Sequence, residues 1–318
     1  MIKKRNLGKT RFQVSEIGLG GSQLGEKIII NNERDLGFGG MNDNTAKSII
    51  NEAISLGINV FDTADTYSLG SSELRLGSNL KKIRKNIFLC TKGGNMIIAP
   101  PKYDITYNNL IASLDRSLIR LQTDYVDVFQ VHTPPKTEKE FNEIERVFRE
   151  IKDEGKTKFC GISVGIKYDE GIEILNRDLV DTIQIYFSLI DEKPLKELLP
   201  LAKKKNIGVI VAEPLAQGLL TKKYKSGHIF PKYDSRSKDY PKKLLEKKLK
   251  RVKQFEFLIN RERSLNQIAL SYVLSRDEIS TCIPGAKSLE QLKSNVASTE
   301  IKLDENELKM IKEIQEKW

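Results

Sequence analysis

Hydrophobic residues along the chain follow two alternating patterns. Short runs rich in β-branched and aromatic residues predict buried strands, and longer segments whose apolar residues recur every three or four positions predict amphipathic helices. Eight strand-like runs follow one another, at residues 16–21, 60–62, 86–92, 125–132, 158–163, 182–186, 208–213 and 281–283. The helical segments lie at residues 45–56, 72–80, 107–121, 137–153, 168–176, 195–205, 244–260, 265–275, 288–298 and 304–317.

This alternation predicts the fold class. Strands that alternate with helices form parallel sheets with right-handed crossovers. Eight such units in 318 residues favour an α/β fold, the (β/α)8 TIM barrel, over an open doubly wound sheet. Residues 3–14 predict an N-terminal β-hairpin, and residues 304–317 predict a C-terminal helix. No stretch has the composition of a linker, so we expect residues 1–318 to form a single domain.

Two stretches, residues 25–41 and 221–243, lack either regular pattern, and we expect long loops there. Loops of this length in a compact domain are usually functional. We therefore expect both to cover one end of the fold and to influence the choice of substrate.

Composition narrows the classes of function. No apolar run approaches the roughly 18 residues of a membrane span, and the basic N-terminus is not followed by the apolar core of a signal peptide. We therefore expect a cytoplasmic protein without a membrane partner. The net charge is +10, but lysines alternate with glutamates and no aromatic residues interleave a basic stripe, so we expect no nucleic-acid partner. The three cysteines form no CxxC pair; we expect buried thiols and neither disulfides nor a metal site.

Ionisable residues end three consecutive predicted strands, where barrel enzymes keep their chemistry. These are Asp62, Lys92 and His132, and Tyr67 follows five residues after Asp62. The phenol of a tyrosine, with a pKa of about 10, is a weak acid at neutral pH, but a nearby ammonium group lowers that pKa. A carboxylate keeps a buried ammonium charged. The four residues therefore predict a proton relay in which Tyr67 is general acid to a carbonyl oxygen that His132 orients.

Each of these residues, taken alone, is more often structural: a helix cap, a surface lysine or a core histidine. Their placement at neighbouring strand ends is what favours catalysis. Other strand ends present Gly20 and Gly21, Ser163, Gln184 to Tyr186, Glu213 and Gly285. The glycines at 18 and 20 do not make a dinucleotide fingerprint, because Gln23 stands where a third glycine is required and no helix opens there.

Several segments, in chain order and over nearly the whole chain, resemble motifs of the aldo-keto reductase family, including its branch of potassium-channel β subunits. They are GINVFDTADTY (57–67) with Ser72 and Glu73, LCTKGG (89–94), LQTDYVDVFQVH (121–132), GIS (161–163), PLAQGLL (214–220) and IPGAKSLEQL (283–292).

The resemblance implies a (β/α)8 barrel that binds a nicotinamide cofactor in an extended form without a Rossmann domain. It implies a catalytic tetrad of Asp62, Tyr67, Lys92 and His132. It also implies a cofactor site, with Ser163 and Gln184 on the nicotinamide carboxamide, Leu215, Gln217 and Gly218 over the pyrophosphate, and residues 287–295, with Lys287, Gln291 and Asn295, on the adenosine. Gly21, Ser22, Asp62 and Gly285, at strand ends, complete the candidate cofactor-binding set.

The chain departs from the family pattern at three cofactor positions. Val164 replaces an asparagine, Ala212 replaces an aromatic residue that often stacks on the nicotinamide, and Gln291 stands where many members have arginine. Lys287 remains as the cation for a 2′-phosphate. NADP(H) is therefore the favoured cofactor, with NAD(H) as the alternative.

Together these features predict an NAD(P)(H)-dependent oxidoreductase that interconverts a small aldehyde or ketone, sugar-derived compounds included, with its alcohol. Two alternatives stay open. One is an NADP(H)-binding sensor or regulatory subunit without turnover. The other is an NAD(P)-dependent sugar epimerase or lyase with an internal redox cycle. The sequence does not distinguish a monomer from a homo-oligomer.

Overall fold

A computed structural model describes the chain apart from residues 1, 31–33, 36–38 and 98–101. Eight parallel strands form one sheet in the order β12-β11-β10-β9-β8-β7-β6-β3. Their bounds are β3 Leu19–Gly20, β6 Val60–Asp62, β7 Phe88–Gly93, β8 Val126–Val131, β9 Thr157–Gly165, β10 Thr182–Tyr186, β11 Gly208–Ala212 and β12 Thr281–Cys282. The predicted set of eight parallel strands is confirmed.

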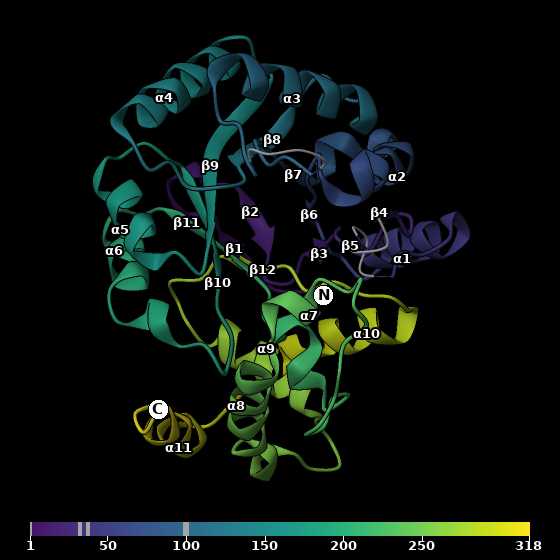
Figure 1. The fold of residues 1–318 in the computed structure, drawn as a ribbon, viewed down its shortest axis with the longest axis vertical. Coiled ribbons are helices and arrows are strands. Elements are labelled where there is room, and N and C mark those ends of the chain that lie inside the picture. The colour runs from purple at the N-terminus through teal and green to yellow at the C-terminus, as the bar shows by residue number, and fades with distance from the viewer. Residues whose placement is uncertain (1, 31–33, 36–38, 98–101) are drawn as a thin grey trace.

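The sheet curls until its first and last strands meet (Figure 1). A parallel bridge joins Ile17, just before β3, to Cys282 in β12. The backbone N–H of Gly18 donates to the carbonyl of Cys282 at 2.8 Å. The structure thus belongs to the barrel class that the alternation predicts.

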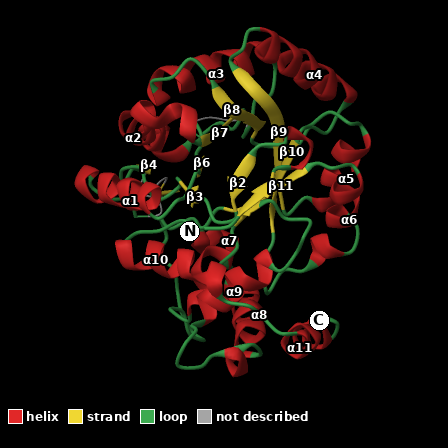
Figure 2. Cartoon of the chain, turned by 180° about the vertical axis from the view of Figure 1, so that it is seen from behind, coloured by secondary structure: helices red, strands yellow, loops and turns green. Residues whose placement is uncertain are grey.

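Helices lie outside the curled sheet (Figures 1 and 2). They are α1 Asp43–Ser55, α2 Ser71–Leu80, α3 Tyr107–Leu121, α4 Glu138–Asp153, α5 Tyr168–Asn176, α6 Leu198–Lys204, α7 Arg236–Asp239, α8 Lys242–Lys253, α9 Leu265–Leu274, α10 Leu289–Ala297 and α11 Glu305–Gln315. The capping box expected from Thr137 and Glu140 opens α4. None of the helices in the described part of the chain combines the length and the apolar character needed to cross a membrane.

Some predicted boundaries are wrong. The helix expected at 195–205 is divided into a 3-10 turn, Lys193–Leu195, and α6, and the one expected at 244–260 ends as α8 at Lys253 before a separate turn. The loop expected at 221–243 contains α7. The loop expected at 25–41 contains the antiparallel strands β4 Ile29–Ile30 and β5 Arg34–Asp35, because its β-branched run finds a partner; six of its residues lie outside the described chain.

The predicted N-terminal hairpin is present as β1 Lys4–Asn6 and β2 Gln13–Ser15, paired antiparallel. Its side chains Leu7 and Val14 join an apolar cluster with residues from the inner face of the strands. That cluster also contains Val60, Phe88, Cys90, Val128, Ile210 and Ile283. The hairpin residues and these strand residues therefore pack together inside the barrel. We call this cluster of eight residues the apolar plug.

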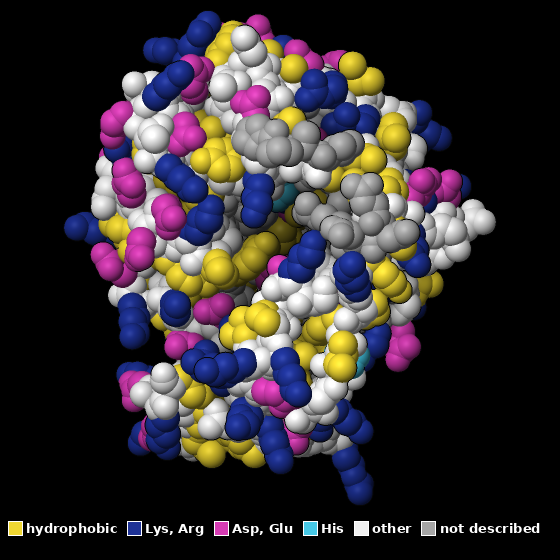
Figure 3. Space-filling model, viewed as in Figure 1, with side chains coloured by type: hydrophobic (Ala, Val, Ile, Leu, Met, Phe, Trp, Pro, Cys, Tyr) yellow, Lys and Arg dark blue, Asp and Glu magenta, His cyan; other side chains and the backbone are white. Residues whose placement is uncertain are grey.

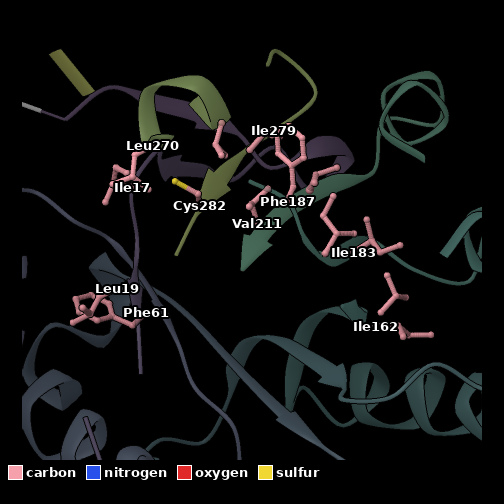
Figure 4. Packing of buried hydrophobic residues seen from close by; sticks show 14 of the residues in the cluster. Ile17, Leu19, Phe61, Ile162, Ile183, Phe187, Val211, Leu270, Ile279 and Cys282 are labelled. Atoms are coloured by element: carbon pink, nitrogen blue, oxygen red, sulfur yellow. The ribbon is translucent and has the colours of Figure 1, made fainter. Parts of the chain in front are cut away.

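Neighbouring positions on the same strands face outward, because side chains alternate along a strand. Phe61, next to Val60, packs in a second and larger core beneath the helices. Figure 4 shows Phe61 beside Leu19, and Cys282 near Val211 in this layer. All three cysteines, Cys90, Cys160 and Cys282, are buried and unpaired, as expected.

Candidate active site

The alternation that builds the apolar plug also positions the polar site. On three neighbouring strands, an inward residue of the plug is followed two positions later by a polar residue that faces the same way. These pairs are Val60 and Asp62 on β6, Cys90 and Lys92 on β7, and Val128 and Gln130 on β8. The polar groups are thus assembled directly above an apolar floor.

Lys92 is the central group of this assembly. Its side chain is fully buried, and its Nζ lies 2.5 Å from Asp62 Oδ1, 2.8 Å from the Thr63 carbonyl oxygen and 3.4 Å from Tyr67 Oη. Burial alone would lower the pKa of Lys92, but the carboxylate of Asp62 outweighs it and holds that pKa above its ordinary value. Lys92 is therefore a permanent cation.

The second carboxylate oxygen of Asp62 is fixed by two amide side chains. Gln130 Nε2 donates to Asp62 Oδ2 at 3.2 Å, and Gln184 Nε2 donates to the same atom at 2.9 Å. Gln184 in turn accepts from Ser163 Oγ at 3.3 Å. The sequence prediction omitted Gln130 as a site residue; its signal was a glutamine inside an apolar strand, two residues before His132.

Tyr67 begins the short turn Tyr67–Gly70 and is half-buried. Burial raises the pKa of Tyr67, and the charge of Lys92 acts in the opposite direction without cancelling it. The lowering by Lys92 that the sequence predicts is present, but desolvation of the phenolate has the larger effect and the net shift is upward. Tyr67 is consequently protonated at neutral pH.

His132 follows β8 and packs edge-on against Tyr67, with the ring centroids 5.8 Å apart. Burial and the neighbouring Lys92 charge lower the pKa of His132 to about 3. The imidazole is therefore neutral at pH 7, with one donor and one acceptor nitrogen. Its Nδ1 is buried and has no hydrogen-bond partner among the described residues.

A cavity of about 680 Å³ opens above these groups. Figure 3 shows a hollow in the same face of the molecule, with Lys and Arg side chains around it. Every residue predicted for catalysis or cofactor binding lines the cavity except Lys92, which is buried beneath it; they are Gly21, Ser22, Asp62, Tyr67, His132, Ser163, Gln184, Leu215, Gln217, Gly218, Gly285, Lys287, Gln291 and Asn295. The described residues contain no cluster of three or more side chains able to hold a metal ion.

The segment that follows β11 lines one side of the cavity in a strained conformation. Glu213, Ala216 and Gln217 have left-handed φ angles of +55°, +49° and +52°. Such angles cost roughly 1–3 kcal/mol for each residue with a side chain, and they concentrate at functional sites. The Oε1 atom of Gln217 is also buried without a hydrogen-bond partner among the described residues.

The segment that follows β12 lines the other side and leads into α10. Ser288 caps this helix by accepting from the backbone N–H of Gln291 at 3.2 Å. Gln291 Oε1 accepts from the backbone N–H of Lys287 at 2.9 Å, and Asn295 Nδ2 donates to the carbonyl of Gly285 at 3.3 Å. The Gln291 and Asn295 side chains therefore shape this end of the cavity.

Gly285 lies against the amide group of the Gln23 side chain. A Cβ atom at this position would lie 1.8 Å from Gln23 Oε1. That oxygen is buried without a partner among the described residues, and Gln23 lines the cavity. The sequence prediction used Gln23 only to exclude a dinucleotide fingerprint and did not place it in the site.

The departures noted in the sequence differ in their consequences. Val164 is buried and does not line the cavity; its side chain is directed toward Gly171 of α5. Ala212 does line the cavity, and Tyr186 from the end of neighbouring β10 lines it as well. The structure therefore brings one aromatic ring, that of Tyr186, to the cavity from the strand beside Ala212.

Comparison with known proteins gives one consistent result. A model of the aldo/keto reductase family matches residues 16–316. L-galactose dehydrogenase of Arabidopsis thaliana is 32% identical over 311 residues, covering 93% of this chain and 88% of that protein. The NADH-specific methylglyoxal reductase of Escherichia coli is 29% identical over 332 residues, covering 99% of each protein. The solved structure of an aldo-keto reductase from Bacillus halodurans in its holo form has a TM-score of 0.80 and 30% identity, covering 99% of this chain and 96% of that one.

Proposed function

Because the chain belongs to the aldo/keto reductase family and is an oxidoreductase, we propose that it interconverts a small aldehyde or ketone with its alcohol by using NAD(P)(H), with Tyr67 as general acid and base. The observation that carries the proposal is the buried contact of Lys92 with Asp62 at 2.5 Å and with Tyr67 at 3.4 Å. The similarity to a galactose dehydrogenase and a methylglyoxal reductase supports a small carbonyl or sugar-derived substrate.

The chemistry of the cavity lining supports a dinucleotide ligand. Its residues Gln23, His132 and Gln217 each bury a polar atom without a protein partner among the described residues, and a ligand rich in polar groups supplies such partners. Ser163 and Gln184 would hold the nicotinamide carboxamide, while Gly21, Ser22, Leu215, Gln217, Gly218 and Gly285 would contact the ribose and pyrophosphate. Lys287, Gln291 and Asn295 would hold the adenosine. When bound, the nicotinamide supplies or accepts the hydride.

The residues of the chain handle the proton. Tyr67 holds it at Oη, because its pKa lies above the ordinary value. As Tyr67 donates to the carbonyl oxygen, Lys92 Nζ at 3.4 Å stabilises the developing phenolate, and Asp62 keeps Lys92 in place. Neutral His132 donates a hydrogen bond to the same oxygen and orients it.

Tyr67→Phe tests this role. General acid catalysis contributes roughly 10²–10⁴-fold, so we expect kcat to fall by about that factor while cofactor binding stays near normal. The matched control is Tyr125→Phe. The ring of Tyr125 lies against Arg84, and this residue does not line the cavity. A Tyr67→Phe enzyme with wild-type kcat on an active substrate contradicts the role.

The binding measurement is a fluorescence titration with NADPH and with NADH. Lys287 favours NADPH because it is a cation in the adenosine part of the cavity, so tighter binding of NADPH is the expected result. If the two cofactors bind with equal affinity, or NADH binds more tightly, Lys287 does not act as the binding group for the 2′-phosphate. If product analysis shows no net cofactor consumption during turnover, the activity is that of an epimerase or lyase and not that of a reductase.

A further inference from the structure

Glu213 is a carboxyl group in the cavity that the proposed mechanism does not use. It follows β11 directly and lines the cavity. The phenols of Tyr67 and Tyr186 and the carboxyl group of Asp239 lie close enough to interact with it electrostatically. Asp239 ends α7, which lies in front of the strands in Figure 1, and it also lines the cavity. Two carboxyl groups from separate elements therefore face the same space.

A dinucleotide that reaches from the tetrad to α10 passes this pair of carboxyl groups. The cavity extends from Tyr67 to Asn295 and is lined by the segments that follow β11 and β12. Glu213 and Gln217 line it on the β11 side, and Asp239 contacts Gln217, whose Nε2 donates to Asp239 Oδ2 at 3.2 Å. The pyrophosphate of a dinucleotide carries negative charge, so its entry brings anionic oxygens toward these two carboxyl groups.

The arginine beside the pair is already engaged. Arg236 lines the cavity, but its guanidinium forms an ion pair with Asp234 at 2.6 Å and donates to Tyr224 Oη at 2.6 Å. It opposes the charge of Glu213 only partly. A proton on Glu213 removes the contribution of this carboxylate to the repulsion directly.

We infer that Glu213 takes up a proton as the dinucleotide enters, so that cofactor affinity falls as the pH rises above neutrality. This inference rests on the proposed function. Burial, and then the charge of Asp239, raise the pKa of free Glu213 to about 7, while the backbone N–H of Gln217 and the Arg236 charge act in the opposite direction. Negative charge on the bound cofactor raises the pKa of Glu213 further.

The sign of the effect follows from that order of pKa values. Glu213 has a higher pKa in the complex than in the free chain. Its contribution to cofactor affinity is therefore complete below the free pKa and is lost as the pH rises through the pKa of the complex. Affinity is therefore expected to fall from about pH 7 upward. Burial raises the pKa of the other phenols that face Glu213, those of Tyr67, Tyr186 and Tyr240, and the pKa of His132 is about 3. None of these groups changes charge in that range.

The experiment is a fluorescence titration of the full chain with NADH at about pH 6.5 and pH 8.5. NADH is the probe because the 2′-phosphate of NADPH titrates near pH 6 on its own. We expect the Kd of the wild type to rise about fivefold or more between the two pH values. Glu213→Gln is expected to bind with nearly the same Kd at both. The control is Glu313→Gln, which removes one charge from an exposed side chain of α11 that does not line the cavity and should keep the wild-type pH dependence.

A Glu213→Gln variant with the wild-type pH dependence overturns the inference and leaves the proposed function intact. Absence of NADH and NADPH binding at every pH, by contrast, contradicts the proposed function itself. If Glu213→Gln does not fold, Asp239→Asn serves instead. It removes a charge that raises the pKa of Glu213, so the loss of affinity should move to lower pH. An unchanged profile in that variant also overturns the inference.

Discussion

The apolar plug and the polar site lie inside the same barrel and are built by the same strands. On β6 and β7, the polar residue of the site follows a plug residue by two positions. In the plug, Val60, Phe88 and Val128 pack with the N-terminal hairpin. In the polar site, Asp62 and Lys92 form a buried ion pair. The comparison teaches that one alternation of side chains along the strands builds both a packed apolar cluster and a buried ionic site, whose contributions to stability and to chemistry can be measured separately.

Removing the buried cation should have the largest effect. Lys92→Met leaves the Asp62 carboxylate buried without its partner, which typically costs about 3–5 kcal/mol of unfolding free energy. It also removes the charge that stabilises the Tyr67 phenolate, so kcat should fall by roughly 10²-fold or more. Urea unfolding and steady-state kinetics measure the two effects.

The double variant Asp62→Asn with Lys92→Met is the control for that result. It removes both charges, so its stability should recover relative to Lys92→Met, while its activity stays low. A single variant as stable as the wild type would show that the pair is not buried in solution as it is in this structure.

A substitution in the plug should separate stability from chemistry. Phe88 is fully buried and its ring centroid lies 4.6 Å from that of Phe12. Phe88→Ala should lower the unfolding free energy by about 3–5 kcal/mol, because it leaves a cavity. The kcat of the folded fraction should remain within about twofold of the wild type, since distant sites act nearly independently. If Phe88→Ala lowered kcat as much as Lys92→Met does, the separation between a stabilising plug and a catalytic site would be wrong.

The smallest predicted effect is the loss of unfolding free energy at acidic pH that His132 causes. The pKa of His132 is about 3 in the folded chain, and it is about 6.5 in an unfolded one. The unfolded chain therefore binds a proton that the folded chain does not, and stability is lost as the pH falls below about 6.5. Between about pH 7 and pH 5 the wild type should lose about 1–2 kcal/mol more than His132→Gln. A His132→Gln variant that loses as much stability as the wild type over this pH range contradicts the prediction.

The sequence allowed much of this arrangement to be predicted, because each of its signals is local. The alternation along a strand and the position of a strand end place Asp62, Lys92 and His132 without knowledge of distant contacts. The bonds from Gln130 and Gln184 to Asp62 join residues 68 and 122 positions apart. No periodicity reports such a contact, so the sequence did not reveal it.

Two other features depended on three-dimensional surroundings. The direction of the pKa shift of Tyr67 is set by a balance between burial and the Lys92 charge, and only the structure shows how deeply the phenol is buried. The approach of Asp239 to Glu213 brings a helix of four residues, inside a stretch without regular pattern, to the end of β11. Segments without periodicity carry no sequence signal for their partners.

The bridge between Ile17 and Cys282 also has a consequence for biosynthesis. Arg5, in the hairpin, donates to the carbonyl oxygens of Leu274 and Ile279 at 2.6 and 3.0 Å. These partners are translated 269 and 274 residues after Arg5. Until then β3 has one open edge, and an open strand edge on a nascent chain is a template for aggregation. Chaperone capture of the ribosome-bound chain should therefore persist until the last strand has left the exit tunnel.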